Sequence, residues 1–357
     1  MTLPLPRSYA PMEAKLVGEL PEGKQWQYEP KWDGFRCLAY RDGKTIDLQS
    51  KSGQPLARYF PDVVEALLAL EAERFVLDGE IVVPVDDTLS FDDLLMRIHP
   101  AASRVQKLSR ERPALYIVFD LLVDASGKSL VDRTLDERRH ALGDFATRWL
   151  GKGGRVRLSP ATSSVATVRK WVRSIGTGLD GIIAKRLDLP YRSGERTGMQ
   201  KIKQIRSADC VVGGFRYASA AKVLGSLLLG LYDDDGLLHH VGFTSSFKAA
   251  ERKTLLARVE PLVKPPGFTG RAPGGPSRWS TRRSDEWQPV APTLVVEVHY
   301  DHFTGGRFRH GTKLLRWRPD KAPRQCTMEQ VENPGRSSLQ LLTAGAQRRA
   351  AASRLKD

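Results

Sequence analysis

The stretch YEPKWDGFR, residues 28–36, decides how the rest of the chain is interpreted. It places Lys31 at the end of a predicted strand, directly before a Trp-Asp-Gly turn and among alternating apolar residues. A lysine at the end of a strand is usually a solvated charge. Lys-x-Asp-Gly alone is a weak motif, because a chain of this length meets it by chance roughly a few per cent of the time. Whether Lys31 is a nucleophile therefore depends on what else in the chain could assist it.

The composition indicates a soluble, basic protein. Among the 357 residues, 56 Lys and Arg outnumber 41 Asp and Glu, which gives a formal net charge of +15 at pH 7. Such an excess favours a polyanionic partner, because cationic side chains release the counterions that condense on phosphates. A basic surface without such a partner is the plainer alternative. Charge therefore indicates a class of partner and no reaction.

The spacing of the cysteines and the N-terminal sequence indicate the cellular compartment in which the protein is expected. Cys37, Cys210 and Cys326 are far apart and none forms a CxxC pair, so neither a zinc knuckle nor a disulfide framework is predicted. Residues 1–16 contain no apolar signal-peptide core, and no segment is long and apolar enough to span a bilayer. We therefore expect a cytoplasmic, nucleoid-associated protein without contact with a membrane.

The first part of the chain has the pattern of a mixed α/β domain. Residues 60–73 and 163–175 have the apolar spacing of helices. Asp42-Gly43 predicts a two-residue hairpin turn. Runs rich in β-branched and aromatic residues predict strands at residues 35–50, 75–83, 115–122 and 181–186.

Beyond these runs, short strands are joined by Gly- and Asp-rich turns, with a helical stretch at residues 247–263 and a Pro/Gly/Arg-rich loop at 264–287. Four or five short strands and one helix in about a hundred residues predict a small barrel of the OB-fold type. The predicted architecture is thus α+β. It has a mixed α/β domain over residues 1–205, a β-barrel OB-fold domain over 206–330, and a basic helix or tail over 331–357.

Short segments with chemical side chains follow Lys31 in one order along the chain. They are SKSG (50–53), LDGE (77–80), IVFD (117–120), DGIIAKR (180–186), MQKIK (199–203) and RWRPDK (316–321). This ordered set resembles the covalent nucleotidyltransferase superfamily, and most closely the ATP-dependent DNA ligases. The short two-domain form is similar to the bacterial ligase C type, and the resemblance covers roughly residues 10–330. Residues 1–205 are then the expected adenylation domain.

Nucleophilic attack by Lys31 requires an unprotonated amine, and the ordinary lysine pKa of about 10.4 leaves little of it at neutral pH. Burial and nearby cations would lower that pKa. Lys201 and Lys203 are candidate cations, because the intervening Ile202 places both on one face of a strand. They could also neutralise charge on the α-phosphate in the transition state. By itself, the KIK segment would be read as a solvated strand face.

Glu80 and Asp180 are carboxylates predicted at strand ends, each beside a glycine. Two carboxylates that converge near phosphates indicate a site for Mg²⁺ or Mn²⁺. The family that the chain resembles usually has Glu at the position of Asp180, so the shorter side chain would reach a metal through water. A plain turn residue is the alternative for Asp180.

The resemblance also implies contacts with the nucleotide. Phe119 would stack on the adenine, Glu29 would accept from its amino group, and Arg36 would hold ribose or phosphate oxygens. Lys51 stands where the family usually has Arg, which removes the bidentate geometry of a guanidinium. Arg196 is implied as a further phosphate contact.

The RWRPDK segment is implied to have a role separate from the nucleotide pocket. In the family that the chain resembles, Arg318, Asp320 and Lys321 orient the leaving pyrophosphate when the barrel closes over ATP. The barrel then turns its other face to DNA. We therefore expect a hinge at residues 204–209.

The resulting hypothesis is an ATP-dependent DNA ligase that acts in DNA repair. Lys31 attacks the α-phosphate of ATP, the AMP passes to the 5′-phosphate at a nick, and the 3′-hydroxyl displaces it. The expected cofactors are ATP and Mg²⁺ or Mn²⁺. The expected substrate is nicked double-stranded DNA, with repair polymerases or end-binding proteins as further partners and a monomer as the assembly state.

Several alternatives stay open at this point. An RNA ligase often lacks a barrel that ends in R-x-D-K, and a capping guanylyltransferase would need GTP, which Glu29 disfavours. An NAD⁺-dependent ligase would carry a nicotinamide-recognition domain ahead of Lys31. A non-catalytic OB-fold module that binds single strands would leave the ordered motifs without a purpose. The preferred break, whether a nick, a short gap, a ribonucleotide end or a blunt end, is also open.

Overall fold

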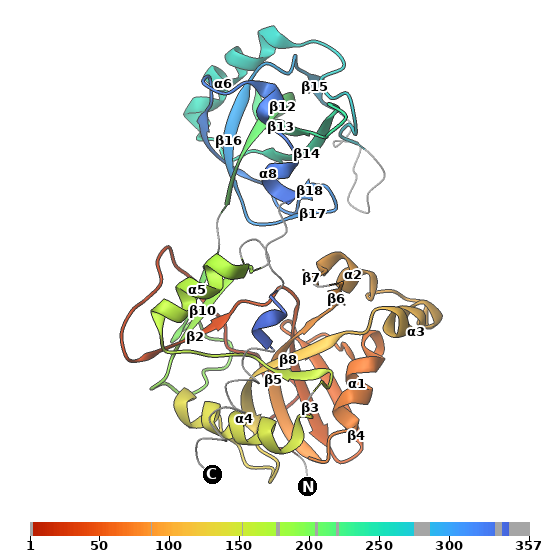
Figure 1. Ribbon diagram of the computed structural model, residues 1–357, viewed down its shortest axis with the longest axis vertical. Coiled ribbons are helices and arrows are strands. Elements are labelled where there is room, and N and C mark those ends of the chain that lie inside the picture. Colours follow the sequence, from red (N-terminus) through yellow and green to blue (C-terminus); the bar gives the residue numbers. More distant parts are fainter. Residues whose placement is uncertain are drawn as a thin grey trace. The chain divides into compact units, whose positions relative to one another are not determined.

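The structure is a computed structural model that describes residues 3–86, 88–151, 153–175, 179–203, 206–218, 221–274, 286–332 and 338–342. The chain divides into two compact units, and Figure 1 labels most of their helices and strands. The first unit comprises Met1–Gln204 and Pro334–Asp357, and the second comprises Ile205–Asn333. Both helices and strands occur in each unit, so the mixed α/β character is confirmed.

The first unit is built on two main sheets and several helices. Its strands are β1 (Lys15–Leu16), β2 (Trp26–Pro30), β3 (Phe35–Asp42), β4 (Thr45–Ser50), β5 (Arg74–Val82), β6 (Pro84–Val85), β7 (Thr88–Leu89), β8 (Leu115–Val123), β9 (Val156–Leu158), β10 (Gly181–Arg186) and β11 (Met199–Lys203). Its helices are the 3-10 helix η1 (Ala57–Tyr59) and the α-helices α1 (Pro61–Leu68), α2 (Phe91–Met96), α3 (Ala102–Glu111), α4 (Leu135–Trp149) and α5 (Val165–Ile175).

The larger sheet has the strand order β4-β3-β5-β8-β9. Helix α4 packs against β8, and α1 packs against β4 (Figure 1). The predicted hairpin between β3 and β4 is present, but its loop is shifted by one residue. Asp42 pairs with Thr45, so the two loop residues are Gly43 and Lys44. The positive φ of Gly43, 61°, suits this position in a tight hairpin turn.

The smaller sheet has the order β1-β11-β10-β2 and carries the end of β2 that precedes Lys31. The Lys31 N–H donates to the carbonyl oxygen of Gly181, the first residue of β10, at 2.9 Å. Gly181 has φ of 150°, and a Cβ there would overlap the carbonyl oxygen of Ile202. Only glycine therefore allows β10 and β11 to meet this closely beside Lys31.

Helix α1 shows how sequence pattern and packing together set an element. It begins at Pro61, a residue that suits the first helical position, and it buries Val63 and Leu67. The pattern predicted a helix over residues 60–73, but the helix ends at Leu68.

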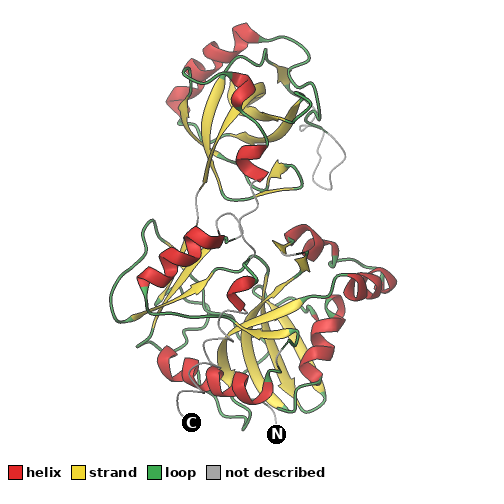
Figure 2. Ribbon diagram, in the orientation of Figure 1, coloured by secondary structure: helices red, strands yellow, loops and turns green. Residues whose placement is uncertain are grey.

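The second unit is mainly a sheet. Its strands are β12 (Arg206–Ala218), β13 (Ala221–Tyr232), β14 (Leu238–Thr244), β15 (Gln288–Pro289), β16 (Val295–Tyr300), β17 (Phe303–Thr304), β18 (Arg307–Phe308) and β19 (Lys313–Trp317). Its helices are η3 (Ala249–Glu251), α6 (Arg252–Val259), η4 (Glu260–Leu262), η5 (Pro323–Gln325) and α8 (Glu329–Glu332). Figure 2 distinguishes these strands from the helices, of which α6 packs against β13.

The strand order of the second unit is β14-β13-β12-β16-β19, with β15 paired to β12. The predicted closed barrel is not observed among the described residues. Between the two outer strands there is one isolated bridge, Thr244 with Thr312, supported by a hydrogen bond from the Thr312 N–H to the Phe243 oxygen at 3.0 Å. Over the described residues the sheet is therefore open, since this bridge does not extend into a ladder.

Three predicted segments lie wholly or partly outside the described residues. They are the first two residues of the hinge (204–205), residues 275–285 of the Pro/Gly/Arg-rich loop, and residues 333–337 and 343–357 of the basic tail. Leu341, in the described part of that tail, is buried in a core cluster of the first unit with Tyr28 and Val168. Within the described ranges, no helix has the length and apolar character needed to cross a bilayer.

Candidate active site

Lys31 lies in the turn that leads from the smaller sheet of the first unit into the larger one. Trp32 is buried and donates from Nε1 to the Ser159 hydroxyl at 3.0 Å. A Cβ at Gly34 would overlap the carbonyl oxygen of Ile81 on β5, so glycine permits the close approach of the turn to this strand. The Lys-x-Asp-Gly segment therefore holds Lys31 where the two sheets meet.

The Lys31 amine forms an ion pair with Asp180, the residue directly before β10. Burial alone would lower the pKa of Lys31, but the negative charges of Asp180, Glu80 and Asp33 outweigh it and raise that pKa above its ordinary value. The predicted lowering of the pKa is therefore wrong for this state. The charges that dominate around the amine are those of carboxylates, and they favour its protonated form.

Glu80 lies within β5 and not at its end as predicted, whereas Asp180 does stand at the start of a strand. Burial raises the pKa of Glu80 to about 7, with smaller contributions from Asp33 and Asp78. A divalent cation would favour the ionised carboxylate and offset that cost. Hard oxygen donors are what Mg²⁺ prefers, so Glu80 and Asp180, both acting on Lys31, fit such an ion.

A cavity of about 170 Å³ opens beside Lys31. Seven of the predicted site residues line it: Glu29, Lys31, Arg36, Lys51, Glu80, Phe119 and Lys201. The rest of its wall comes mainly from the N-terminal segment 11–14 and from Ile183, Lys185 and Met199. The cavity thus combines an aromatic ring, several cations and carboxylates around one lysine, which suits a nucleotide with its phosphates.

Arg36 is held rigidly at this cavity. Its Nε and Nη2 atoms each donate to one carboxylate oxygen of Asp78 at 2.6 Å, and the Tyr191 hydroxyl donates to the same carboxylate at 2.7 Å. The guanidinium lies over the Phe119 ring, 4.5 Å from its centroid. Asp78, fully buried, had no predicted role. It fixes the orientation in which Arg36 faces the cavity.

Glu29 forms a buried ion pair that sequence reasoning missed. Its carboxylate is 2.9 Å from Lys185 Nζ, across the β2–β10 pairing, and accepts from the Gln27 amide at 2.8 Å. Lys185 Nζ also lies 4.5 Å from the centroid of the Phe119 ring. Phe119 is in the middle of β8. Lys185 thus contacts both Glu29, which is expected to accept from the adenine amino group, and Phe119, which is expected to stack on the adenine.

The remaining predicted phosphate contacts are Lys51, Arg196 and the two lysines of β11. Lys51 and Arg196 both pair with Glu13, at 3.0 and 3.1 Å, and both are more than half exposed. Partial burial and the charges of neighbouring cations, Lys203 among them, lower the pKa of Lys201. Arg196 and Lys203 do not line the cavity itself. Glu13 had no predicted role, because its pairing with Lys51 and Arg196 depends on where these residues lie in the folded chain.

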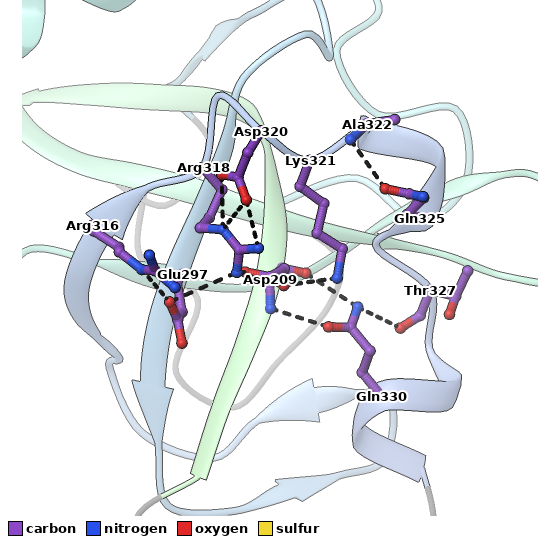
Figure 3. A network of polar contacts seen from close by, with 10 residues as sticks. All are labelled: Asp209, Glu297, Arg316, Arg318, Asp320, Lys321, Ala322, Gln325, Thr327 and Gln330. Atoms are coloured by element: carbon purple, nitrogen blue, oxygen red, sulfur yellow. Dashed lines mark hydrogen bonds and ion pairs between the residues drawn. The ribbon is translucent and has the colours of Figure 1, made fainter.

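The RWRPDK residues of the second unit form a network of their own (Figure 3). Arg318 donates from Nη1 to Asp209 at 2.9 Å, and from Nε and Nη2 to Asp320 at 3.0 and 2.9 Å. Lys321 Nζ donates to Asp209 at 2.7 Å. Asp209 on β12 was not among the predicted site residues, yet it binds both Arg318 and Lys321.

Comparison with known proteins shows the family to which the chain belongs. A family model described as ATP dependent DNA ligase domain matches residues 11–203, and one described as ATP dependent DNA ligase C terminal region matches residues 220–321. The chain is 43% identical over 354 residues to DNA ligase C2 of Mycolicibacterium smegmatis, covering 95% of this chain and 98% of that protein. It is 42% identical over 363 residues to DNA ligase C of Mycobacterium tuberculosis, covering 97% and 99%.

A solved structure with much lower sequence identity to this chain shares its fold. A solved structure from a structure–function analysis of Lig E DNA ligases covers 87% of this chain and 99% of its own, with a TM-score of 0.54 and 16% identity. The chain therefore belongs to the ATP-dependent DNA ligases. Within that family, the near full-length relatives place it in the bacterial ligase C type.

Proposed function

We propose that this chain seals 5′-phosphate/3′-hydroxyl nicks in double-stranded DNA through a lysyl-adenylate on Lys31 and a DNA-adenylate. The observation that carries the proposal is the position of Lys31, at the meeting of two sheets and on the wall of a cavity that holds Phe119, Glu29 and Lys201. The AMP moves from the Lys31 Nζ to the 5′-phosphate, and the 3′-hydroxyl then releases it. A role in DNA repair follows from this chemistry.

Base recognition rests on Glu29 and Phe119. A carboxylate accepts and never donates, so Glu29 suits the exocyclic amino group of adenine. Lys185 pairs with Glu29 and holds it in place, because an unpaired buried carboxylate at this position would be costly. Phe119 provides the stacking surface. We therefore propose ATP and not GTP as the nucleotide.

The phosphates are proposed to lie between Arg36, Lys51 and the lysines of β11. Burial, and after it the charges of neighbouring cations, lowers the pKa of Lys201, and an incoming triphosphate would offset the repulsion between these cations. Arg196 would contribute from the exposed side.

Lys31 must lose its proton and its Asp180 partner before its Nζ can attack phosphorus. Glu80 and Asp180 are the residues that would hold Mg²⁺ or Mn²⁺ in this reaction. A bound cation would supply positive charge for the α-phosphate oxygens. Engagement of Asp180 elsewhere would remove the charge that raises the Lys31 pKa, and the nearby cations would then favour the free amine.

The second unit is proposed to be an OB-fold domain, despite its open sheet, that serves the reaction twice. Arg318, Asp320 and Lys321 would act on the leaving pyrophosphate, and another face of the unit would bind duplex DNA, with residues 204–209 as the hinge. The net charge of +15 supports a DNA partner. We further propose a nucleoid-associated monomer that cooperates with a repair polymerase or an end-binding protein.

The proposal is tested by labelling and ligation with the intact chain. Incubation with radiolabelled ATP and Mg²⁺ should label the protein covalently, and radiolabelled GTP should not. The labelled protein should then seal a nicked DNA duplex and release AMP. Labelling by GTP alone would favour a capping guanylyltransferase, and sealing of RNA duplexes alone would favour an RNA ligase.

A further inference from the structure

Asp209 occupies a position that is costly for the fold. It lies on β12 directly opposite Glu297 of β16, and Glu297 lies opposite Arg316 of β19. Two carboxylates directly opposite each other on neighbouring strands repel at short range. Arg316 binds Glu297 at 2.6 Å, and Arg318 bridges the two acids at 2.9 Å from Asp209 and 3.8 Å from Glu297. The sheet thus keeps a repulsive pair that depends on the arginines.

The carboxylate of Asp209 is largely buried and is shared by two cations from one loop. Its side chain is 11% exposed, whereas that of Asp320 is 61% exposed. Arg318 Nη1 lies 2.9 and 3.2 Å from the two oxygens of Asp209, and Lys321 Nζ lies 2.7 Å from one of them. Buried, charge-assisted contacts of this kind are stronger and better defined than exposed ones.

The backbone of Asp209 is fixed as well. Gln330 of α8 accepts from the Asp209 N–H at 3.1 Å and donates to the Asp209 carbonyl at 3.3 Å. The same amide donates to the Thr327 carbonyl at 3.2 Å. Figure 3 shows Gln330 and the loop cations on the two sides of Asp209. Asp209 is therefore a rigid base to which the flexible Arg318 and Lys321 side chains are tied.

We propose that Asp209 is a positioning residue for transfer of AMP from ATP to the enzyme. It acts through Arg318 and Lys321, which it holds ready for the leaving pyrophosphate. This role rests on the proposed function of the R-x-D-K segment. Preorganised cations are effective because they need not reorganise while charge develops on the leaving group. Sealing of an already adenylated nick releases no pyrophosphate, so that step does not need Asp209.

The test compares Asp209→Asn with the wild type in three reactions. They are covalent labelling by ATP, removal of the label by added pyrophosphate, and sealing of a nick that already carries AMP. Asp209→Asn should slow labelling by on the order of tenfold or more, because small misplacements of catalytic groups have effects of this size. It should also require more pyrophosphate for the reverse reaction, since both directions share one transition state. Sealing of the pre-adenylated nick should continue at the wild-type rate.

Two controls distinguish a positioning role of Asp209 from a general disturbance of the fold. Asp233→Asn removes another paired acid of the same unit, bound to His239 at 2.6 Å, and should change none of the three reactions. Asp209→Asn in an Arg318→Ala, Lys321→Met background should cause no further loss of labelling, because its partners are already absent.

Three outcomes would overturn the role of Asp209. They are unchanged labelling and pyrophosphate dependence in Asp209→Asn, equal losses in all three reactions, and a further loss of labelling in the double background. A wild-type chain that takes no label from ATP would overturn the proposed function together with this role. A labelled wild type with an unaffected Asp209→Asn variant would overturn the role of Asp209 alone.

Discussion

The cavity around Lys31 and the network around Asp209 are both made of paired charges, but the pairing has different consequences. In the cavity, burial raises the pKa of Glu80 to about 7, and burial with nearby cations lowers the pKa of Lys201. In the network, Arg318 and Lys321 are neutralised by carboxylates of their own unit. Perturbed groups mark a place that a ligand completes. In the proposed mechanism, the neutralised network is a preassembled element that acts when the leaving pyrophosphate competes for its cations.

The largest expected effect is the loss of adenylation when Lys31 is removed, which no other cation of the cavity should cause. Lys31→Ala should abolish covalent labelling by ATP, because it removes the amine that pairs with Asp180 at the end of β2. The mutant should still fold, with a lowered unfolding temperature because the buried Asp180 loses its ion-pair partner. Lys44→Ala, at an exposed position in the β3–β4 turn, is the control and should label normally. Label retained on Lys31→Ala would place the nucleophile elsewhere.

A second prediction concerns the acids of the cavity. Glu80→Ala or Asp180→Ala should slow adenylation by about tenfold or more and weaken its dependence on Mg²⁺. Titration of Mg²⁺ in the labelling reaction measures both effects. Asp188→Ala removes an exposed acid of the same unit, paired with Arg186, and should leave the titration unchanged. Wild-type Mg²⁺ curves for both cavity variants would refute the metal assignment.

A third prediction concerns the network, where the effect should be confined to one step. Asp320→Ala or Lys321→Ala should impair formation of the lysyl-adenylate and leave sealing of a pre-adenylated nick nearly normal. Lys313→Ala, an exposed change on the adjoining strand β19, should not affect adenylation. Equal losses with ATP and with the pre-adenylated nick would mean that these residues touch DNA or hold the fold. The cavity and the network would then not differ in the way described.

The smallest effect is the dependence of stability on pH through Glu80. Its pKa in the folded chain, about 7, lies above the ordinary 4.5. Its contribution to the free energy of unfolding is therefore fully present below about pH 4.5 and is lost as pH rises through about 7. Urea unfolding without divalent cations should show wild type losing stability relative to Glu80→Gln over this interval. A relative gain would contradict the burial of this carboxylate as the cause.

Local motifs could be predicted from the sequence because they act over few residues. The position of Lys31 after β2 and the glycines of the Asp-Gly pairs follow from such short patterns. The charge state of Lys31 could not be predicted, because its nearest partner, Asp180, is 149 residues away. The roles of Lys185 and Asp209 depend on which residues face each other across paired strands. Propensity does not determine that register, and neither does it determine whether a sheet closes.

The central claim is that Lys31 carries the AMP, and mass spectrometry of the adenylated protein tests it most directly. After incubation with ATP and Mg²⁺, the chain is digested and the modified residue is located by fragmentation under conditions that preserve the phosphoramidate bond. The account predicts one AMP, attached to Nζ of Lys31 in the peptide that contains residues 28–36. AMP on Lys201, Lys203 or another residue, with Lys31 unmodified, would contradict it.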